Sequence, residues 1–514
     1  MPSWGEGYFT ASHYTYGYFD YLSPVQQRFA LLLNGLDCPP GTAEAQHCEL
    51  GFGQGVSLNV HSASNPGSYT GTDFTPDQVV FAAELARRAG NTTLRLFDDS
   101  FADFHARDDL PQFDSISMHG IWSWVSGENR RILMDIVRKR LKPGGILYLS
   151  YNCLPGWANI QPLQRLMELH DRYAGESAKA EQRVDRALGF VRQVLATEPA
   201  YAHAAGTILR QQLDTLGQDR RYLAHEYLNR NWTAPYFCDV AQALAELRLD
   251  FGATSQVLRR LDALYLTHTQ RRMLAGIDHP IVREQVQDYC VNERFRTDLF
   301  VRGAVRLGPE AQRIRLFDQR VVLCVPEDKI SYTVTTPLGT FEPNDDQYGP
   351  VREALAGDSG APKRIGDIVA HARRFGLEEA PSLRALLTLM GTHQVYACQP
   401  ESDERLVRTR SRGFNRAVAE LALEDDHLHT MASPVTGAGV SGIGRAERLF
   451  ILALLNRAED PVAFAWQALK AVDASWVHDG KTLEGDAANL TAFKAQYTTF
   501  RQERLPLLQV LGVL

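Results

Sequence analysis

Alternating glycines preceded by a glutamate form the stretch best suited to hold a small ligand: Glu49-Leu50-Gly51-Phe52-Gly53-Gln54-Gly55. Glycine adopts turns that a Cβ would strain, and it lets the backbone approach a ligand closely. Asp73 ends the next apolar run, where a carboxylate of a nucleotide-binding α/β unit accepts hydrogen bonds from ribose hydroxyls. The spacing predicts a nucleotide-type ligand and places Glu49 where a positive ligand group could approach.

Further polar and aromatic clusters follow at intervals along the same region. They are Phe74 beside Asp73, Asp99-Ser100-Phe101, His119-Gly120 with Trp122 and Trp124, and Tyr151-Asn152. Most of them follow a short apolar run, so they are expected near the ends of strands. A lone histidine is more often structural, but one that stands beside a glycine at the end of a strand favours a place in a pocket.

The elements that must position these clusters alternate between strand and helix. Strands are expected at 46–50, 68–73, 93–97, 113–118 and 146–151, helices at 56–64, 78–89 and 129–141, and a turn at 142–145. Such alternation predicts a parallel sheet with helices on both faces, and ligands bind at the carboxyl ends of its strands. Because the clusters gather at such ends, the sequence predicts one shared site.

An aromatic arm precedes this sheet. It contains Tyr8, Phe9, His13, Tyr14, Tyr16, Tyr18, Phe19 and Tyr21. Tyr14, Tyr16 and Tyr18 alternate, which places them on one face of an extended segment. The arm is either a packing segment laid over the next domain or an aromatic wall around a cationic group. A helix is expected from Pro24 to about Asn34.

Four regions follow the expected sheet. Residues 161–222 are expected to form a helical connector, 223–305 an α+β middle domain, 306–400 a winged-helix-like module and 401–514 a mainly helical C-terminal domain. The arm and first helix occupy 1–45, and the ligand-binding domain 46–160. A winged-helix-like module binds DNA in some proteins and serves for docking or dimerisation in others, so the fold alone does not settle its role.

Two motifs in these regions resemble functional motifs without matching their context. Gly437 to Gly442 spells G-x-G-x-x-G, but Pro434 stands where a buried strand should run, so a flexible glycine loop is expected. His225-Glu226 lacks the second histidine of a zinc-protease helix, because position 229 is Asn229.

Composition narrows the class of protein. A chain of 514 residues is too long for a single core, and its net charge of −7 argues against general affinity for nucleic acid or anionic membranes. The seven cysteines never form a C-x-x-C pair, which favours a reducing compartment and argues against a structural metal site. We see neither a signal peptide nor a membrane span. The sequence therefore predicts a soluble cytoplasmic protein without a metal.

The motifs carry a family resemblance. Glu49-x-Gly51-x-Gly53-x-Gly55, Asp73 and the segment Leu141-Lys142-Pro143-Gly144-Gly145 resemble class I S-adenosylmethionine-dependent methyltransferases. His119 to Val125, Ser150 to Trp157 and Trp232 to Val240 are similar to the branch with a methyltransferase regulatory domain, which includes rickettsial outer-membrane-protein lysine methyltransferases. Phe52 departs from many relatives, which have a small residue or cysteine there, and its ring is expected to point away from the ligand.

The resemblance implies a fold and roles for the site residues. The fold is an α/β Rossmann-like class I methyltransferase domain followed by the regions described above. Glu49 would meet the methionine ammonium of S-adenosylmethionine, the glycines would lie against it, and Asp73 would hold the ribose. Residues expected around the adenine are Phe74, Asp99, Ser100 and Phe101. Those expected near the methyl or the acceptor are His119, Gly120, Tyr14, Tyr18, Trp122 and Tyr151.

The same resemblance favours a protein lysine methyltransferase. The large part of the chain outside the catalytic domain suits a macromolecular acceptor, although it could equally build a homodimer. A small-molecule or glycan methyltransferase is the alternative, and a non-catalytic binding or regulatory protein on the same fold is a second one. A lysine amine must be neutral to attack, against an ordinary pKa of about 10.4, so an aromatic, desolvated acceptor site is expected, with His119 or a tyrosine as proton acceptor.

Overall fold

The computed structural model describes residues 15–38, 41–173, 180–215, 220–342, 345–471, 477–478, 481–482 and 485–514. The first part of the aromatic arm, including the acceptor-site candidate Tyr14, lies outside the described residues.

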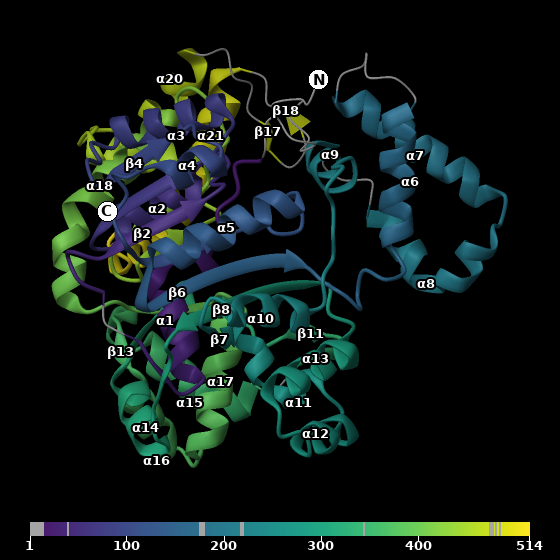
Figure 1. The fold of residues 1–514 in the computed structure, drawn as a ribbon. Coiled ribbons are helices and arrows are strands. Elements are labelled where there is room, and N and C mark those ends of the chain that lie inside the picture. The colour runs from purple at the N-terminus through teal and green to yellow at the C-terminus, as the bar shows by residue number, and fades with distance from the viewer. Residues whose placement is uncertain are drawn as a thin grey trace.

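A mixed sheet of seven strands lies at the centre of the molecule (Figure 1). Its strands are β2 (Gln46–Leu50), β3 (Ser68–Thr72), β4 (Leu94–Phe97), β5 (Phe113–Met118), β6 (Leu141–Asn152), β7 (Leu249–Thr254) and β8 (Phe295–Arg302). Their order is β4-β3-β2-β5-β6-β8-β7, and β8 runs in the direction opposite to the other six strands. The chain order reverses between β2 and β5, which is where open α/β sheets bind ligands. This topology confirms the expected Rossmann-like sheet.

Helices cover both faces of the sheet. They are α1 (Pro24–Leu33), α2 (Val56–Ser64), α3 (Pro76–Arg88), α4 (Phe101–Ala106), α5 (Gly127–Arg140) and α10 (Phe237–Ala245). Phe104, Ile136 and Phe237 bring α4, α5 and α10 into one core with β5 and β6. On the other face, α1 packs against β6 and β8, while α2 and α3 share a separate core.

The expected turn at 142–145 is wrong, because β6 already begins at Leu141. Leu141 pairs with Phe113 of β5, and the register then shifts before Ser115 pairs with Ile146. Gly144 takes a φ of +77° within this irregular stretch. The two glycines therefore lie in an irregular part of one long strand, although the local sequence had indicated a turn before the strand.

The sheet is not confined to the range 46–160. Its last two strands, β7 and β8, come from the range 223–305, and β8 pairs with β6 over seven residues from Ile146 to Asn152. The middle region adds η2 (Val257–Arg260), α11 (Asp262–Tyr265), α12 (His268–Ala275) and α13 (Pro280–Val291). The central sheet thus includes strands that come from the middle region.

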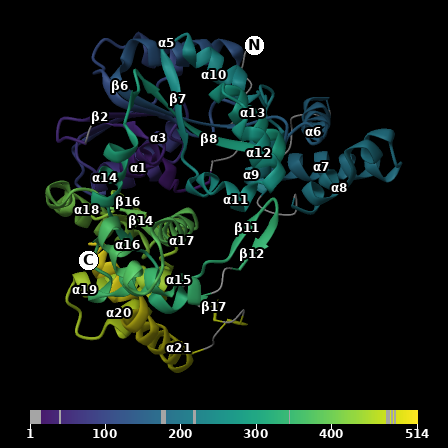
Figure 2. The same ribbon diagram turned by 90° about the horizontal axis from the view of Figure 1, so that it is seen from below.

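Between β6 and α10 the described chain forms four helices, and the first three of them project at one side of the molecule (Figures 1 and 2). These are α6 (Gln161–Tyr173), α7 (Ala180–Ala196), α8 (Ala200–Thr215) and α9 (Arg220–Tyr227). They enclose a core of their own, which also includes Trp124 and Trp157.

The region after residue 306 is built on a small antiparallel sheet. Its strands are β10 (Arg320–Leu323), β13 (Lys363–Arg364) and β14 (Val395–Ala397), in the order β13-β10-β14. Around it lie α14 (Pro309–Asp318), α15 (Asp345–Ala356), α16 (Ile365–Arg374), α17 (Glu379–Gly391) and the hairpin β11 (Val334–Thr336) and β12 (Gly339–Phe341). The short helix η3 (Glu327–Lys329) precedes this hairpin. A short pair, β1 (Leu36–Asp37) with β9 (Val305–Arg306), ties the region to α1.

The C-terminal region is mainly helical and covers α2. It contains α18 (Glu401–Leu421), β15 (Met431–Ser433), β16 (Ala438–Val440), α19 (Arg445–Leu455), α20 (Pro461–Ala471), α21 (Asp486–Thr499) and α22 (Leu505–Val510), with the short strands β17 (Val477–His478) and β18 (Lys481–Thr482). Gly437 lies in the buried β15–β16 turn, where its carbonyl accepts hydrogen bonds from Ser23 and Asn65. The expected flexible glycine loop is therefore wrong.

Candidate active site

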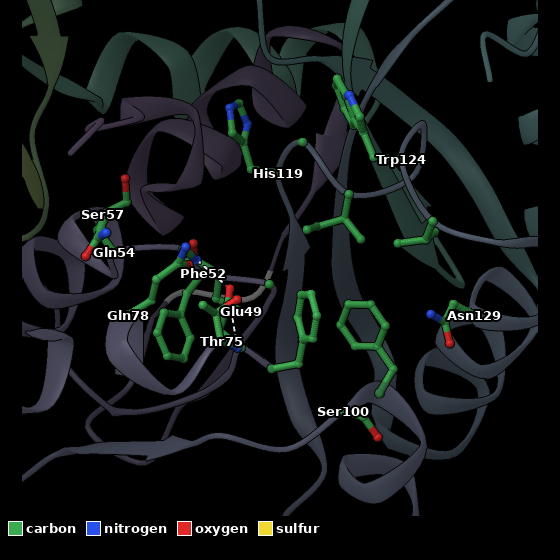
Figure 3. Close-up of a pocket in the computed structure, with 18 of the residues that line it drawn as sticks. Glu49, Phe52, Gln54, Ser57, Thr75, Gln78, Ser100, His119, Trp124 and Asn129 are labelled. Atoms are coloured by element: carbon green, nitrogen blue, oxygen red, sulfur yellow. Dashed lines mark hydrogen bonds between the residues drawn. The ribbon is translucent and has the colours of Figure 1, made fainter. Parts of the chain in front are cut away.

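A cavity opens at the carboxyl ends of β2, β3, β4 and β5 (Figure 3). The residues that line it from the predicted clusters are Glu49, Gly51, Phe52, Gly53, Gln54, Asp73, Phe74, Asp99, Ser100, Phe101, His119, Gly120 and Trp124. The fold thus brings the glycine turn, both acids, the aromatic residues and the histidine into one site. This is the convergence that strand ends in a parallel sheet predict.

The glycine turn has the backbone conformation that its residue types predicted. Gly51, Gly53 and Gly55 have φ angles of +73°, +57° and +66°. A Cβ on Gly51 would lie 2.2 Å from Cδ1 of Ile121, which itself lines the cavity. Gly55 does not line the cavity, because it faces α3, where a Cβ would lie 2.6 Å from that of Ala82. Gly55 therefore serves helix packing, while Gly51 and Gly53 face the site.

Phe52 lines the cavity but belongs chiefly to the core. Its side chain is 7% exposed and packs with Leu58, Tyr69 and Ala82. The ring thus closes the space beneath the turn and fills the gap over Gly71, where a Cβ would lie 2.8 Å from it. The ring was expected to point away from the ligand. It does pack into the core, but part of the residue also borders the cavity.

Asp73 organises the turn through its carboxylate. One oxygen accepts a hydrogen bond of 2.8 Å from the amide of Gly53, and the other accepts one of 3.0 Å from the amide of Thr75. The Thr75 side chain also hydrogen-bonds to this carboxylate. A carboxylate has about four acceptor positions, so it keeps the capacity to accept from a ligand hydroxyl. Burial outweighs these hydrogen bonds and raises the pKa of Asp73 to about 6.

Glu49 is the second buried acid, and its side chain is 6% exposed. Burial, followed by the neighbouring Asp73, raises its pKa to about 8. Among the described residues, no hydrogen-bond donor or basic side chain offsets these effects. An uncompensated carboxyl in a cavity suits a ligand that brings its own positive charge.

Asp99 and Ser100 have partners within the protein. The Asp99 carboxylate pairs with Arg107, and its backbone carbonyl accepts a 2.7 Å hydrogen bond from Thr72. Ser100 is the N-cap of α4, because its hydroxyl accepts from the amide of Asp103. Both residues border the cavity while they fix the start of α4.

His119 sits between an aromatic ring and two hydroxyl groups. Its Nδ1 lies 2.9 Å from the Tyr148 hydroxyl and 3.2 Å from that of Ser150, and the Phe19 ring centroid lies 3.9 Å from its own. The amide of Gly120 also donates to Ser150, over 2.8 Å. Burial lowers the pKa of His119 to about 4, so the ring is neutral at neutral pH.

Three acceptor-site candidates point away from the cavity. Tyr151 is fully buried and donates a 2.6 Å hydrogen bond to Asp298. Since strand residues alternate between faces, the orientation of Ser150 toward His119 sends Tyr151 to the other side. Trp122 belongs to the same core as Tyr151.

Tyr18 is directed by the same alternation. Its neighbours Gly17 and Phe19 line the cavity. Its own hydroxyl lies 3.1 Å from Nε2 of His61 and accepts a hydrogen bond from the amide of Gly439 in the C-terminal region. Tyr18 therefore anchors the N-terminal segment, and of the indoles it is Trp124 that lines the cavity.

Several lining residues carried no signal in the sequence. They are Thr15, Gly17, Ser57, Thr75, Gln78, Ser126, Asn129 and Asn231, whereas Phe19 belongs to the aromatic arm and Ile121 and Val125 to the motif that begins at His119. The strand pattern 148–150 could have indicated Tyr148 and Ser150 as partners of His119, because both share its side of the sheet. Asn231 could not have been found in this way, because it follows a helix that comes far later in the chain than the predicted strands.

No helix of the described chain is long and apolar enough to span a bilayer. Within the same described ranges, no three His, Cys, Asp or Glu side chains gather as metal ligands.

Comparisons with known proteins agree with this geometry. A family described as a methyltransferase domain matches residues 48–147, and one described as a predicted methyltransferase regulatory domain matches residues 219–302. The uncharacterized protein sll1526 of Synechocystis sp. is 35% identical over 513 residues, which cover 99% of this chain and 100% of that protein. The uncharacterized protein RP028 of Rickettsia prowazekii is 30% identical over 233 residues, covering 45% of this chain and 87% of its own.

Among solved structures, PKMT2 from Rickettsia typhi, in complex with AdoHcy, is similar with a TM-score of 0.68. The two chains are 19% identical, and the match covers 95% of this chain and 98% of PKMT2. The shared fold thus extends through the regions that follow the sheet. The chain belongs to the S-adenosylmethionine-dependent methyltransferases that carry a methyltransferase regulatory domain.

Proposed function

We propose that this enzyme transfers the methyl group of S-adenosylmethionine to lysine side chains of proteins. The observation that carries the proposal is the charge of the cavity. Its described lining includes the carboxyl groups of Glu49, Asp73 and Asp99 but no lysine or arginine. Asp99 is already paired with Arg107, and Glu49 holds its proton at neutral pH until a cation approaches. The acidic lining therefore favours a cationic donor, and it disfavours acceptors that carry a phosphate or carboxylate over an amine.

The residues present fit the donor. Glu49, a buried acid that no described cation offsets, would pair with its ammonium group. Gly51 and Gly53 would let its amino-acid part lie against the backbone. Asp73 would accept from the ribose hydroxyls with its remaining lone pairs, and Phe74 and Phe101 would flank the adenine.

The bound donor supplies an activated methyl group on a sulfonium sulfur. The acceptor nitrogen forms the new bond to that carbon while the carbon–sulfur bond breaks, and the sulfur keeps the bonding electron pair. Because the leaving group is already activated, the protein mainly aligns the reactants and excludes water. Phe19 and Trp124, both on the cavity wall, provide apolar surface for that purpose.

His119 is a poor base for an ammonium ion. Its pKa of about 4 lies far below the ordinary lysine pKa of about 10.4. Moving the proton from a lysine to this ring would cost about 9 kcal/mol at roughly 1.4 kcal/mol for each pKa unit. The amine must therefore reach the methyl group in its neutral form, which desolvation beside aromatic rings favours. His119 then contributes a neutral polar wall and a fixed orientation.

Two further considerations support a protein acceptor. The motifs resemble those of lysine methyltransferases, and the chain shares its fold with PKMT2 over nearly its whole length. Much of the chain lies outside the catalytic sheet, which suits docking of a macromolecule.

Transfer of a labelled methyl group into a lysate of the host tests the proposal. We expect label in the protein fraction and, after hydrolysis, in methylated lysine. Label confined to small molecules would favour a small-molecule or glycan acceptor instead. Absence of both transfer and S-adenosylmethionine binding would favour a non-catalytic protein. The Asp73→Ala variant, which lacks the ribose-holding carboxylate, serves as the inactive control.

A further inference from the structure

The range matched by the regulatory-domain family contributes a residue to the methyl-transfer cavity. Asn231 lines the cavity, whereas every other described lining residue lies between Thr15 and Asn129. Its side chain is half-buried, so a ligand in the cavity can reach it. The cavity is therefore completed by a segment outside the catalytic motifs.

Residues 226–233, called the 226–233 segment below, are hydrogen-bonded to the end of β6. The Glu226 carboxylate accepts a hydrogen bond of 2.6 Å from the Asn152 amide and one of 3.3 Å from the indole of Trp232. Glu226 is 5% exposed. Asn229, which is fully buried, accepts a 3.0 Å hydrogen bond from the amide of Asn231 through its side chain. These buried contacts fix where Asn231 lies.

The same segment is also hydrogen-bonded to the loop that joins β5 to α5 and to α5 itself. The amide of Thr233 donates to the carbonyl of Ser123 over 2.8 Å, and Arg130 donates to the Thr233 hydroxyl over 2.6 Å. The Asn229 amide donates to the carbonyl of Trp124 over 3.4 Å. The position of Trp124 in the cavity wall thus depends on the 226–233 segment.

Trp124 marks the side of the cavity near the end of β5. A Cβ on Gly120 would lie 4.0 Å from Cζ3 of Trp124, so the indole lies beside the His119-Gly120 pair. Figure 3 places Trp124 and His119 together at one end and Gln54, Ser57 and Gln78 around the glycine turn at another. The groups matched to the donor lie around that turn, which leaves the end near Trp124 for the acceptor.

We infer that the 226–233 segment forms part of the acceptor wall and that Asn231 is a specificity-determining residue for the acceptor. This inference rests on the proposed function. A primary amide offers two donor hydrogens and one acceptor oxygen, which suits the peptide groups beside a modified lysine. The regulatory-type range then acts at the active site by choosing the acceptor.

Variants of the full-length chain test this assignment. We expect Asn231→Ala and the similarly sized, uncharged Asn231→Leu to bind S-adenosylmethionine within about twofold of wild type by calorimetry. Methyl incorporation into the protein fraction of the host lysate should fall at least about tenfold at low lysate concentration, which corresponds to about 1.4 kcal/mol. The deficit should shrink as lysate protein is raised, because a lost acceptor contact raises the KM for the acceptor more than it lowers kcat.

Asn159→Ala is the matched control, because Asn159 is an exposed asparagine outside both the cavity and the segment. It should behave as wild type. Incorporation by the Asn231 variants equal to that of the control would overturn the inference. So would weaker S-adenosylmethionine binding with unchanged acceptor dependence, since it would assign Asn231 to the donor. If wild type labels only small molecules, the protein acceptor itself is refuted, which is a separate outcome.

Discussion

Replacing Glu49 by glutamine removes the charge of a buried carboxyl and keeps its shape. In the folded wild-type protein, burial raises the pKa of the Glu49 carboxyl from 4.5 to about 8. At roughly 1.4 kcal/mol for each pKa unit, the ionised form is less stable in the ligand-free fold than in the unfolded chain by about 5 kcal/mol. Because the folded pKa is the higher one, this penalty is absent below pH 4.5 and complete above about pH 8. Glu49→Gln should therefore be several kcal/mol more stable than wild type at pH 8.5 and equal to it at pH 4.5.

The donor should reverse this preference. An ammonium group beside Glu49 favours its ionised form, so binding expels the proton that the ligand-free protein holds. A group with a pKa of about 8 carries about 0.9 of a proton at pH 7. We therefore expect nearly one proton to be released for each S-adenosylmethionine bound at pH 7, where the donor's own ammonium group, with an ordinary pKa of about 8, is still mostly protonated. Calorimetry in two buffers of different ionisation enthalpy measures this number directly.

The variant separates Glu49 from other titrating groups. Glu49→Gln should release almost no proton at pH 7 and should bind S-adenosylmethionine about 10- to 100-fold more weakly, as expected when a charge-assisted hydrogen bond is lost. Glu44→Gln, which changes an exposed acid near the same strand, should alter neither quantity. Equal proton release by wild type and Glu49→Gln would refute the reasoning, because the donor's positive group would then lie elsewhere.

Three further changes test the glycine turn and the N-terminal contact. Asp73→Asn should weaken S-adenosylmethionine binding about 10- to 100-fold by calorimetry. It should shift the Tm by only a few degrees, since burial already disfavours the charged form of Asp73. A large loss of Tm would contradict this expectation. Gly51→Ala adds a Cβ 2.2 Å from Ile121 at a φ of +73° and should abolish binding, so measurable affinity would speak against close packing of the turn. His393, which lies 2.8 Å from Asp20, has a raised pKa, so its stabilising contribution is full below pH 6.5 and is lost as the pH rises through the folded value. His393→Asn, at a φ of +59° that asparagine tolerates, should flatten the fall of Tm above pH 6.5, and an unchanged profile would argue against the pair.

Much of the sheet was predictable from local pattern. The strands Gln46–Leu50 and Phe113–Met118 and the helix Val56–Ser64 have the bounds that the sequence predicted. Apolar runs, glycines that end helices and prolines that begin them act within a few residues, so they can be recognised from the sequence alone. The irregular start of β6 was not legible, because only pairing with Phe113 draws Leu141 into the strand.

The prediction of side-chain direction was less successful. Tyr18, Trp122 and Tyr151 are aromatic residues near the right strand ends, yet all three face away from the cavity. In extended segments a shift of one residue moves a side chain to the opposite face. Residue type and position therefore indicated the neighbourhood, while the register with adjacent strands decided which neighbour faces the site.

The sequence by itself determined where the cavity forms, because the glycine turn, Glu49, Asp73 and His119 stand at the ends of strands that the local pattern predicts. Tertiary structure alone decided three things. It completed the sheet with β7 and β8, it covered the polar helix α2 with the C-terminal region, and it brought Phe19 and Asn231 to the cavity. The protonation states of Glu49 and His119 also depend on the tertiary structure, because the desolvation that shifts their pKa values is set by all the groups that surround them in space.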